Sequence, residues 1–388
     1  MKADAARTVC HLTVLNPARH TRIFYKLART QAAAGWKVYV IGQDPSPAPY
    51  EAEGVQVIPR RPFHRLAWER WLAPLLLFRQ AWRVRARLYV IHAPELLFTA
   101  GLLKLTTRAR ILYDVHEDYQ ANIRAARHYP GWLRRPLAWA VRAWERLAVS
   151  WLDGVSYAEA VYENFLQLPP ARHTLVRNTF QATEQPAPED TSVPEAPYLL
   201  VTGTLAPGWG VLEALALWQK LCTHTPIRLV VAGHGQHPGF IRDIQETAAR
   251  SGFEAYFTLI GGDTYVPYAR IQSLIRGCRA GLALYEVSPN IQGKIPTRFY
   301  EYMALGKPLI FTPDADWVAF NHQWHIGLPA MPAETSASEW WEALDAVVRA
   351  YQQPPAEAWA WDTDGVRWLA LCERVVDSVR SGSPGPGA

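Results

Sequence analysis

Residues 295–312 read IPTRFYEYMALGKPLIFT, a short helical pattern that runs directly into an apolar strand. Pro296 suits a first helical turn, and Gly306 followed by Pro308 ends the helix before the strand begins. A helix that feeds a strand is half of a βαβ unit, so this stretch predicts a parallel α/β sheet. The free amides and the dipole at the N-terminus of such a helix favour phosphate.

Two series of short apolar strands with helical spacers extend outward from this segment. The first series comprises 9–15, 38–41, 88–91, 111–113, 154–157 and 174–176, with a helical stretch at 21–34. The second comprises 198–202, 228–232, 256–260, 281–284 and 309–312. This alternation is typical of doubly wound parallel sheets, in which ligands bind beyond the carboxyl ends of the strands. We expect two Rossmann-like α/β domains with a cleft between them.

The domain boundaries follow from composition. Residues 180–197, FQATEQPAPEDTSVPEAP, lack periodicity and are rich in Pro and Glu, which is typical of a linker. The predicted organisation is a first domain at 1–179, this linker, a second domain at 198–355, a C-terminal helix at 356–380 and a disordered tail at 381–388.

Composition excludes several classes of protein. With 388 residues and 49% hydrophobic side chains, the chain has material for two cores and is not disordered. Its four cysteines form no CxxC pair or zinc-spaced cluster, which is typical of small buried side chains in a reducing compartment. The N-terminus lacks a signal-peptide pattern, and the longest apolar run, at 71–78, is too short to span a membrane. These features predict a cytoplasmic protein that is soluble or lies on the inner membrane surface.

Charge is unevenly distributed along the chain. Residues 1–178 hold 26 Lys and Arg against 13 Asp and Glu, and the remainder holds 14 against 22, so the two parts carry +13 and −8. The first part therefore suits an anionic partner. Nucleic acid is disfavoured, since no binding module is recognisable and the second part is acidic.

Arg298 and Glu301 are the candidate ligand-binding residues of the opening segment. The helix dipole alone would favour a carboxylate in the first turn, so Arg298 there indicates a nearby anion. Glu301 lies on the same helical face and is suited to bind a ribose diol. An ordinary amphipathic helix with a surface Arg–Glu pair fits the same residues.

The segment resembles a known donor-site signature. Residues 296–303, PTRFYEYM, resemble the Pro-Thr-Lys-Leu-Phe-Glu-Tyr-Met run of a bacterial branch of the retaining family 4 glycosyltransferases. Other stretches match that branch in the same order, namely 11–38, HAPELL at 92–97, YDVHEDY at 113–119, VVAGHG at 230–235 and SPN at 288–290. The resemblance covers roughly residues 8–320. It implies a GT-B fold and transfer from a nucleotide-diphosphate sugar to a saccharide or lipid-linked acceptor, as in cell-envelope polysaccharide synthesis.

The resemblance also implies residue roles. The residues expected to bind the donor in the second domain are Gly203, Thr204, Gly208, Trp209, Gly210, Gly233, Asn290, Lys294, Pro296, Thr297, Arg298 and Glu301. The residues expected on the acceptor side are Arg22, His92, Glu95, His116, Glu117 and Asp118. His116, Arg298 and Glu301 are the candidate catalytic residues, and the alternative for His116 is a loop residue that caps the next helix. No cofactor and no metal are expected. Catalysis would involve closure about the 180–197 linker, and the C-terminal helix would pack back toward the first domain.

The chain departs from the family at the donor diphosphate. In GTLAPGWGVLEAL (203–215), Thr204 and Trp209 stand where most relatives carry an Arg and a Lys or Arg. Their loss removes two charge-assisted contacts to the leaving group. Arg298, Lys294 and Arg22 could compensate, together with amides near Gly208 and Gly210. The alternative is a GT-B-like binding or scaffold subunit without turnover. A sugar-nucleotide epimerase is a third hypothesis, but the acid and base groups that it would need are not identifiable.

Two segments of the first domain combine arginine with tryptophan. Residues 60–87 hold eight arginines, and residues 124–151 hold six arginines with four tryptophans. Basic helices with Trp suit an anionic membrane surface. Core tryptophans with solvated arginines would give the same composition.

Overall fold

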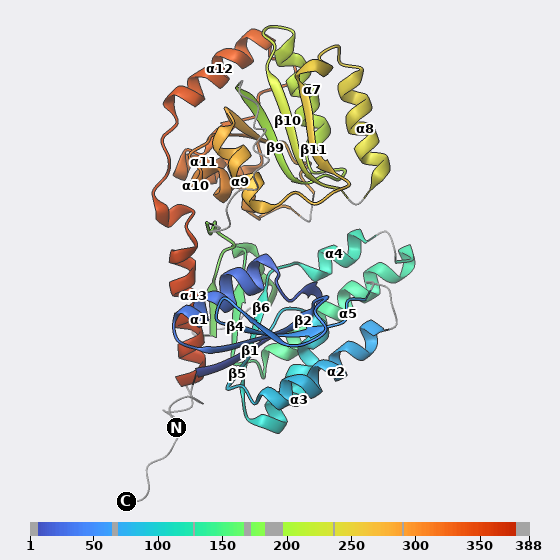
Figure 1. Ribbon diagram of the computed structural model, residues 1–388, viewed down its shortest axis with the longest axis vertical. Coiled ribbons are helices and arrows are strands. Elements are labelled where there is room, and N and C mark those ends of the chain that lie inside the picture. The colour runs from blue at the N-terminus through green and yellow to red at the C-terminus, as the bar shows by residue number, and fades with distance from the viewer. Residues whose placement is uncertain are drawn as a thin grey trace, which may run out of the picture. The chain divides into compact units, whose positions relative to one another are not determined.

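The computed structural model describes residues 7–63, 69–126, 129–166, 172–182, 197–235, 237–288 and 291–377. Most of the expected linker, at 183–196, and the expected tail, at 381–388, lie outside these ranges. The chain divides into two compact units (Figure 1). Unit 1 comprises Met1–Asn178 with Trp361–Ala388, and unit 2 comprises Thr179–Ala360.

Unit 1 is built on an eight-stranded sheet with the order β3-β4-β2-β1-β5-β6-β7-β8. All neighbours pair in parallel except β3 with β4. The strands are β1 (Thr8–Pro17), β2 (Lys37–Gln43), β3 (Tyr50–Ala52), β4 (Val55–Arg60), β5 (Leu88–Ile91), β6 (Arg110–Val115), β7 (Gly154–Tyr157) and β8 (His173–Leu175). The helices are η2 (Thr21–Ala28), α1 (Arg29–Ala33), α2 (Glu69–Val84), η3 (Pro94–Leu96), α3 (Leu97–Thr107), α4 (Tyr119–Ala125), α5 (Gly131–Val149), η4 (Ala160–Tyr162), α6 (Glu163–Leu166) and α13 (Trp361–Asp377).

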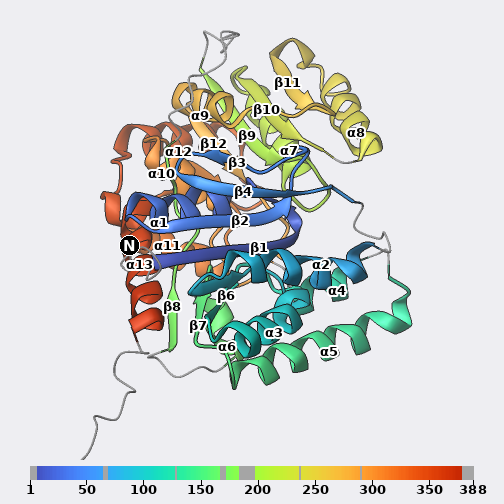
Figure 2. The same cartoon turned by 60° about the horizontal axis from the view of Figure 1, so that its bottom comes forward.

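Helices cover both faces of this sheet. Alternate residues of β1 point to opposite sides: Cys10 and Leu12 join a core with α2, α3 and α5, whereas Val9 joins a core with η2 and α13. Burial on both faces explains why the strands are continuous apolar runs. Figure 2 shows α2, α3 and α5 together on one side of the sheet.

Unit 2 is built on a six-stranded parallel sheet with the order β11-β10-β9-β12-β13-β14. The strands are β9 (Tyr198–Thr204), β10 (Arg228–His234), β11 (Phe257–Gly262), β12 (Ala280–Ala283), β13 (Leu309–Phe311) and β14 (Gly327–Pro329). One core packs this sheet against α7 (Val211–Cys222), α8 (Pro238–Ala249) and α12 (Ala337–Ala350). The other packs it against α9 (Tyr268–Gly277), α10 (Thr297–Ala304) and α11 (Ala315–Trp324). Two short 3-10 turns, η6 (Glu254–Tyr256) and η7 (Ala356–Ala358), complete the unit.

Each strand expected from the sequence is present, with its ends within two residues of the expected positions. The sequence did not indicate β3, β4 and β14. These are edge or near-edge strands, of which two are only three residues long and β4 contains Pro59 near its end. Short edge strands carry weak periodicity, so their pattern is easily lost.

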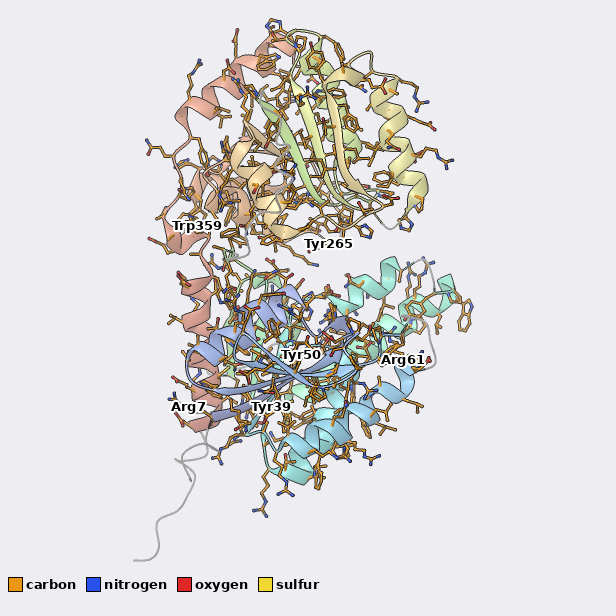
Figure 3. The ribbon with its side chains drawn as sticks, in the orientation of Figure 1. Arg7, Tyr39, Tyr50, Arg61, Tyr265 and Trp359 are labelled. Carbon is orange, nitrogen blue, oxygen red and sulfur yellow. The ribbon has the colours of Figure 1, made fainter. Side chains whose placement is uncertain are left out.

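The C-terminal helix begins at Trp361 rather than at residue 356. Residues Ala356–Ala358 form the short 3-10 turn η7 instead, which belongs to unit 2. There Phe180 donates its backbone N–H to the backbone oxygen of Trp359 at 2.7 Å, and the two rings meet edge to face. Trp359 is one of the residues labelled in Figure 3. From Trp361 onward the helix packs in unit 1, where Trp368 and Leu371 are fully buried.

All four cysteines are free and buried, as their scattered positions predicted. Among the described helices, none combines the length and the apolar character that crossing a membrane requires.

Candidate functional site

Unit 1 gathers polar side chains at its topological switch point. The chain runs from β1 to β2 on one side and later returns to β5 on the other, so the loops after β1 and β5 diverge. His20 follows β1, His92 follows β5, and His116 follows β6. His11, inside β1, completes what we call the histidine cluster, made of His11, His20, His92 and His116.

Asp114, near the end of β6, links this cluster to Arg22. The fully buried carboxylate accepts two hydrogen bonds from Arg22, from Nη2 to Oδ1 at 2.7 Å and from Nε to Oδ2 at 3.0 Å. Ser156 Oγ donates to Oδ1 at 2.7 Å. His92 Nδ1 lies 3.1 Å and His116 Nδ1 lies 3.5 Å from Oδ2. A single carboxylate therefore orients two of the histidines.

The charge state of Asp114 is set by these partners. Burial alone would raise the pKa of its carboxyl group, but the charge of Arg22 and the hydrogen bonds from His116, His92 and Arg22 hold that pKa well below its ordinary value. The group is therefore a permanent anion that balances the charge of buried Arg22.

Three histidines of the cluster, His11, His20 and His92, are held neutral. Burial lowers the pKa of His11 to about 3, helped by nearby His92 and opposed by the hydrogen bond with Gln31. Burial also lowers the pKa of His20 to about 3, helped by His116, His92 and Arg22. The pKa of His92 is lowered by burial in spite of its contact with Asp114. Neutral imidazoles can each donate one hydrogen bond and accept another.

This burial predicts acid sensitivity. Between pH 6.5 and about 3 the unfolded chain binds protons that folded His11 and His20 exclude, so stability is present above pH 6.5 and is lost as the pH falls. Each histidine should remove up to about 1.4 kcal/mol from the free energy of unfolding per pH unit. We expect His20→Asn to flatten the dependence of the urea midpoint on pH between 7 and 5, whereas the exposed control His224→Asn should leave it unchanged. Equal slopes for both variants would contradict this assignment.

His92, Asp114 and His116 could each offer one ligand atom to a metal ion, since these atoms lie within 4.8 Å of one another. The Arg22 guanidinium, however, already engages both oxygens of Asp114. His92 Nε2 is also within 3.0 Å of His11 Nδ1. A divalent cation would have to displace a buried cation from its carboxylate, which disfavours a metal at this place.

Two buried donor-capable atoms in and beside this cluster have no hydrogen-bond partner among the described residues, namely His20 Nδ1 and Arg22 Nη1. Buried polar groups are nearly always satisfied by protein, water or ligand. The Nε2 atom of His116 lies 3.4 Å from Asn16 Nδ2, which is a long contact for a hydrogen bond. The cluster therefore has capacity for an oxygen-rich ligand.

The remaining acidic residues expected on the acceptor side have local partners. Glu95, in η3, pairs with Arg70. Glu117 is exposed and accepts from Asn122 at 2.9 Å. Asp118 accepts from the Ala121 N–H and from Arg142 at 2.8 Å, so Asp118, and not His116, is the cap of α4.

Unit 2 has its own switch point, between β9 and β12. At the carboxyl ends of three neighbouring strands, Gly203, Gly233 and Gly261 stand side by side in register. Side chains are excluded here: a Cβ at Gly233 would lie 1.8 Å from the Gly203 oxygen, and one at Gly261 would lie 2.3 Å from the Gly233 oxygen. We call these residues the glycine row.

Arg298 reaches this row from the first turn of α10. A Cβ at Gly203 would lie 1.6 Å from Arg298 Nη2, so the guanidinium occupies the space that the glycine leaves open. The side chain is only 7% exposed, and its guanidinium carbon lies 5.8 Å from the centre of the Tyr285 ring. The alternative hypothesis, that Arg298 belongs to a surface Arg–Glu pair, is therefore wrong.

Glu301, one turn along α10, is partly exposed. Tyr268 donates its hydroxyl to Glu301 Oε1 at 3.0 Å, which fixes one oxygen of the carboxylate. Together with burial, this contact raises the pKa of Tyr268, so its hydroxyl stays protonated as the donor.

Thr204 is the last residue of β9, and Trp209 lies in the loop that follows. Both are exposed, and Trp209 meets Tyr285 edge to face with ring centres 5.9 Å apart. Gly208 and Gly210 flank it with φ of +80°, and a Cβ at Gly210 would lie 2.4 Å from the Leu284 backbone. The loop thus seats Trp209 beside the ring that contacts Arg298.

The structure gathers Gly203, Thr204, Trp209, Gly233 and Arg298 at one edge of unit 2. Pro296 is the N-cap of α10 and Thr297 is its first residue. Lys294 lies in the preceding loop, where its carbonyl accepts from Trp317 at 2.7 Å. Asn290 lies outside the described residues.

Several residues of these sites were not predicted. In unit 1 they are His11, His20, Asp114 and Ser156, and in unit 2 they are Tyr268 and Tyr285. A charged residue inside an apolar strand, as at Asp114, was the one signal in the sequence that could have drawn attention to this cluster.

Residues 21–179 match a family model described as Glycosyltransferase Family 4. A search of curated proteins found no match.

Solved structures resemble the whole chain. Sucrose-phosphate synthase from Thermosynechococcus elongatus has a TM-score of 0.64 at 15% identity, covering 97% of this chain and 98% of that one. HepE from Anabaena, in complex with UDP and glucose, has a TM-score of 0.58 at 13% identity, covering 97% and 100%. An α,α-trehalose-phosphate synthase from Burkholderia xenovorans, in complex with glucose-6-phosphate, has a TM-score of 0.61 at 12% identity, covering 97% and 98%. The chain therefore has the GT-B fold.

Proposed function

We propose that this protein is a retaining glycosyltransferase that moves a sugar from a nucleotide-diphosphate donor to a saccharide or lipid-linked acceptor in cell-envelope polysaccharide synthesis. The observation that carries the proposal is the Arg298 guanidinium above the glycine row of unit 2. The family 4 match over residues 21–179 supports the same class.

Unit 2 would bind the donor. The glycine row gives the Arg298 guanidinium a place against the backbone. Arg298 then supplies a fixed cation that can form two parallel hydrogen bonds to a phosphate. Glu301, whose carboxylate accepts from Tyr268, would also accept hydrogen bonds from the ribose hydroxyls. UDP-glucose is the first donor to test, since HepE was solved with UDP and glucose.

Unit 1 would bind the acceptor. Arg22 Nη1 and His20 Nδ1 could meet acceptor oxygens, with His116 oriented beside them by Asp114. In the reaction the bond from the anomeric carbon to the diphosphate breaks, and a bond to the acceptor oxygen forms. The acceptor proton passes to the leaving phosphate oxygen, so positioning and charge stabilisation supply most of the catalysis.

We propose that no metal takes part, because the cation of Arg298 takes the role of neutralising the diphosphate. Chelation should then leave transfer unchanged.

Glu301→Ala should weaken donor binding by about 2 kcal/mol, since it removes a charged acceptor from the ribose hydroxyls. Calorimetry with a nucleoside diphosphate measures the change. Tyr268→Phe is the matched control: it keeps the carboxylate and should cost far less. Unchanged affinity in Glu301→Ala would remove Glu301 from the site.

A product assay tests the activity itself. The wild-type protein should release nucleoside diphosphate from a sugar donor and extend a saccharide or lipid-linked acceptor. A second candidate function is a scaffold subunit without turnover. It is favoured by the presence of Thr204 and Trp209 where related enzymes carry two cations. That candidate is supported if donors bind but no product forms with any acceptor.

A further inference from the structure

The helices on one side of the unit 1 sheet carry an unusual outer surface. Among the described residues, sixteen large apolar side chains are exposed, and ten of these lie on α2, α3 and α5. The ten are Leu72, Leu75, Leu76, Trp82, Phe98, Leu105, Trp132, Trp139, Trp144 and Leu147. We call the outer surface of these three helices the helical layer.

The exposure follows helical geometry. On α5, Ala138, Arg142, Glu145 and Ala148 are buried, three or four residues apart, and form the inward stripe. Trp132, Trp139 and Leu147, seven and eight residues apart, lie on the opposite side and are 78%, 70% and 61% exposed. On α2 the exposed Leu72, Leu75 and Leu76 likewise oppose the buried stripe of Ala73, Leu77 and Ala81.

The charges on the layer are mostly positive. The three helices hold eight basic and two acidic residues. One of the eight basic residues, Arg142, and one of the two acids, Glu145, are buried and paired with each other, so neither contributes charge to the outer surface. Arg70 and Lys104 are paired with Glu95 and Asp153. Arg79, Arg83 and Arg135 are exposed between the apolar side chains.

We infer that the helical layer docks unit 1 on an anionic membrane surface. Tryptophan with arginine suits the interfacial region, where the rings enter the headgroup boundary and the guanidinium groups meet phosphates. The layer extends the two Arg- and Trp-rich segments of the sequence by α3, whose Leu105 is 82% exposed. Docking itself does not depend on the proposed function. If that function holds, docking would bring lipid-linked acceptors to unit 1.

Sedimentation with vesicles tests this inference. The protein should bind vesicles of phosphatidylcholine mixed with phosphatidylglycerol, should bind phosphatidylcholine alone poorly, and should dissociate as salt rises. Replacing Arg79, Arg83 and Arg135 by Gln should lower partitioning by about a hundredfold, at roughly fivefold per arginine. The matched control replaces the exposed arginines Arg242, Arg276 and Arg349 of unit 2 by Gln and should bind as wild type does.

A second variant separates apolar insertion from charge. Trp132→Ala combined with Trp139→Ala and Leu105→Ala should also lower partitioning, whereas Val366→Ala, an exposed apolar change on α13, should not. Circular dichroism verifies folding of each variant. Wild-type protein that stays in the supernatant with anionic vesicles at low salt would overturn the inference. A second result would also overturn it: the wild type self-associates, and the apolar variant loses this self-association but still binds vesicles. The helical layer would then be an interface between copies of the chain.

Discussion

Arg298→Ala should strongly slow sugar transfer while lowering nucleoside monophosphate binding only modestly. The guanidinium is seated over the glycine row, and the two cations usual at Thr204 and Trp209 are missing, so Arg298 would carry the main charge on the leaving diphosphate. Losing one or two charge-assisted hydrogen bonds of roughly 1.5–3 kcal/mol each should slow transfer by a factor on the order of ten to ten thousand. Steady-state kinetics with a nucleotide sugar measures the change.

Two further variants sharpen this result. Arg298→Lys keeps the charge but loses the planar fork, so it should retain partial activity. Gly203→Ala places a Cβ where Arg298 Nη2 lies and strains a backbone with φ of +102°, so it should mimic the loss of Arg298 without removing it. If Arg298→Ala weakened the monophosphate as much as the diphosphate, the residue would not contact the leaving group.

The second large effect concerns stability. Asp114→Asn leaves the buried guanidinium of Arg22 without its counter-charge. The Arg22 side chain is only 2% exposed. Removing one partner of a buried ion pair typically costs about 3–5 kcal/mol of unfolding free energy. Urea unfolding followed by circular dichroism should show this loss.

Removing both charges provides the control for Asp114. Combining Asp114→Asn with Arg22→Met should recover part of the stability, because no uncompensated charge then remains buried. A cost below about 1 kcal/mol for Asp114→Asn alone would mean that Arg22 finds another anion or reaches water.

The architecture could be predicted well from the sequence because the strands of a parallel sheet that is buried on both faces are runs of apolar residues. Runs such as 88–91 and 154–157 became β5 and β7 without change. It predicted β3 and β14 poorly because three-residue edge strands bury little and leave hardly any pattern. The start of α13 was predicted five residues too early. Residues Ala356–Ala358 are good helix formers, but the chain at this turn is held by a contact distant in sequence, from Phe180 to Trp359.

The sites were predictable where a motif carried them. The Pro-Thr-Arg run pointed to Arg298, but the seat of its guanidinium over Gly203 depends on packing between α10 and β9, which no local pattern reveals. Asp114 was overlooked within YDVHEDY because its role arises from Arg22, His92 and Ser156, which lie far away in the sequence. Such convergence at a switch point follows from topology rather than from spacing.

The most direct test of the central claim is calorimetric titration of the wild-type protein and of the Thr204→Arg/Trp209→Lys double variant with nucleoside diphosphates and sugar nucleotides. We expect the wild type to bind at least one nucleotide-diphosphate sugar and Arg298→Ala to weaken this binding. The double variant should bind more tightly, because it places two cations beside the glycine row. If neither the wild type nor the double variant bound any sugar nucleotide, the glycosyltransferase proposal would be contradicted, and a scaffold role would replace it.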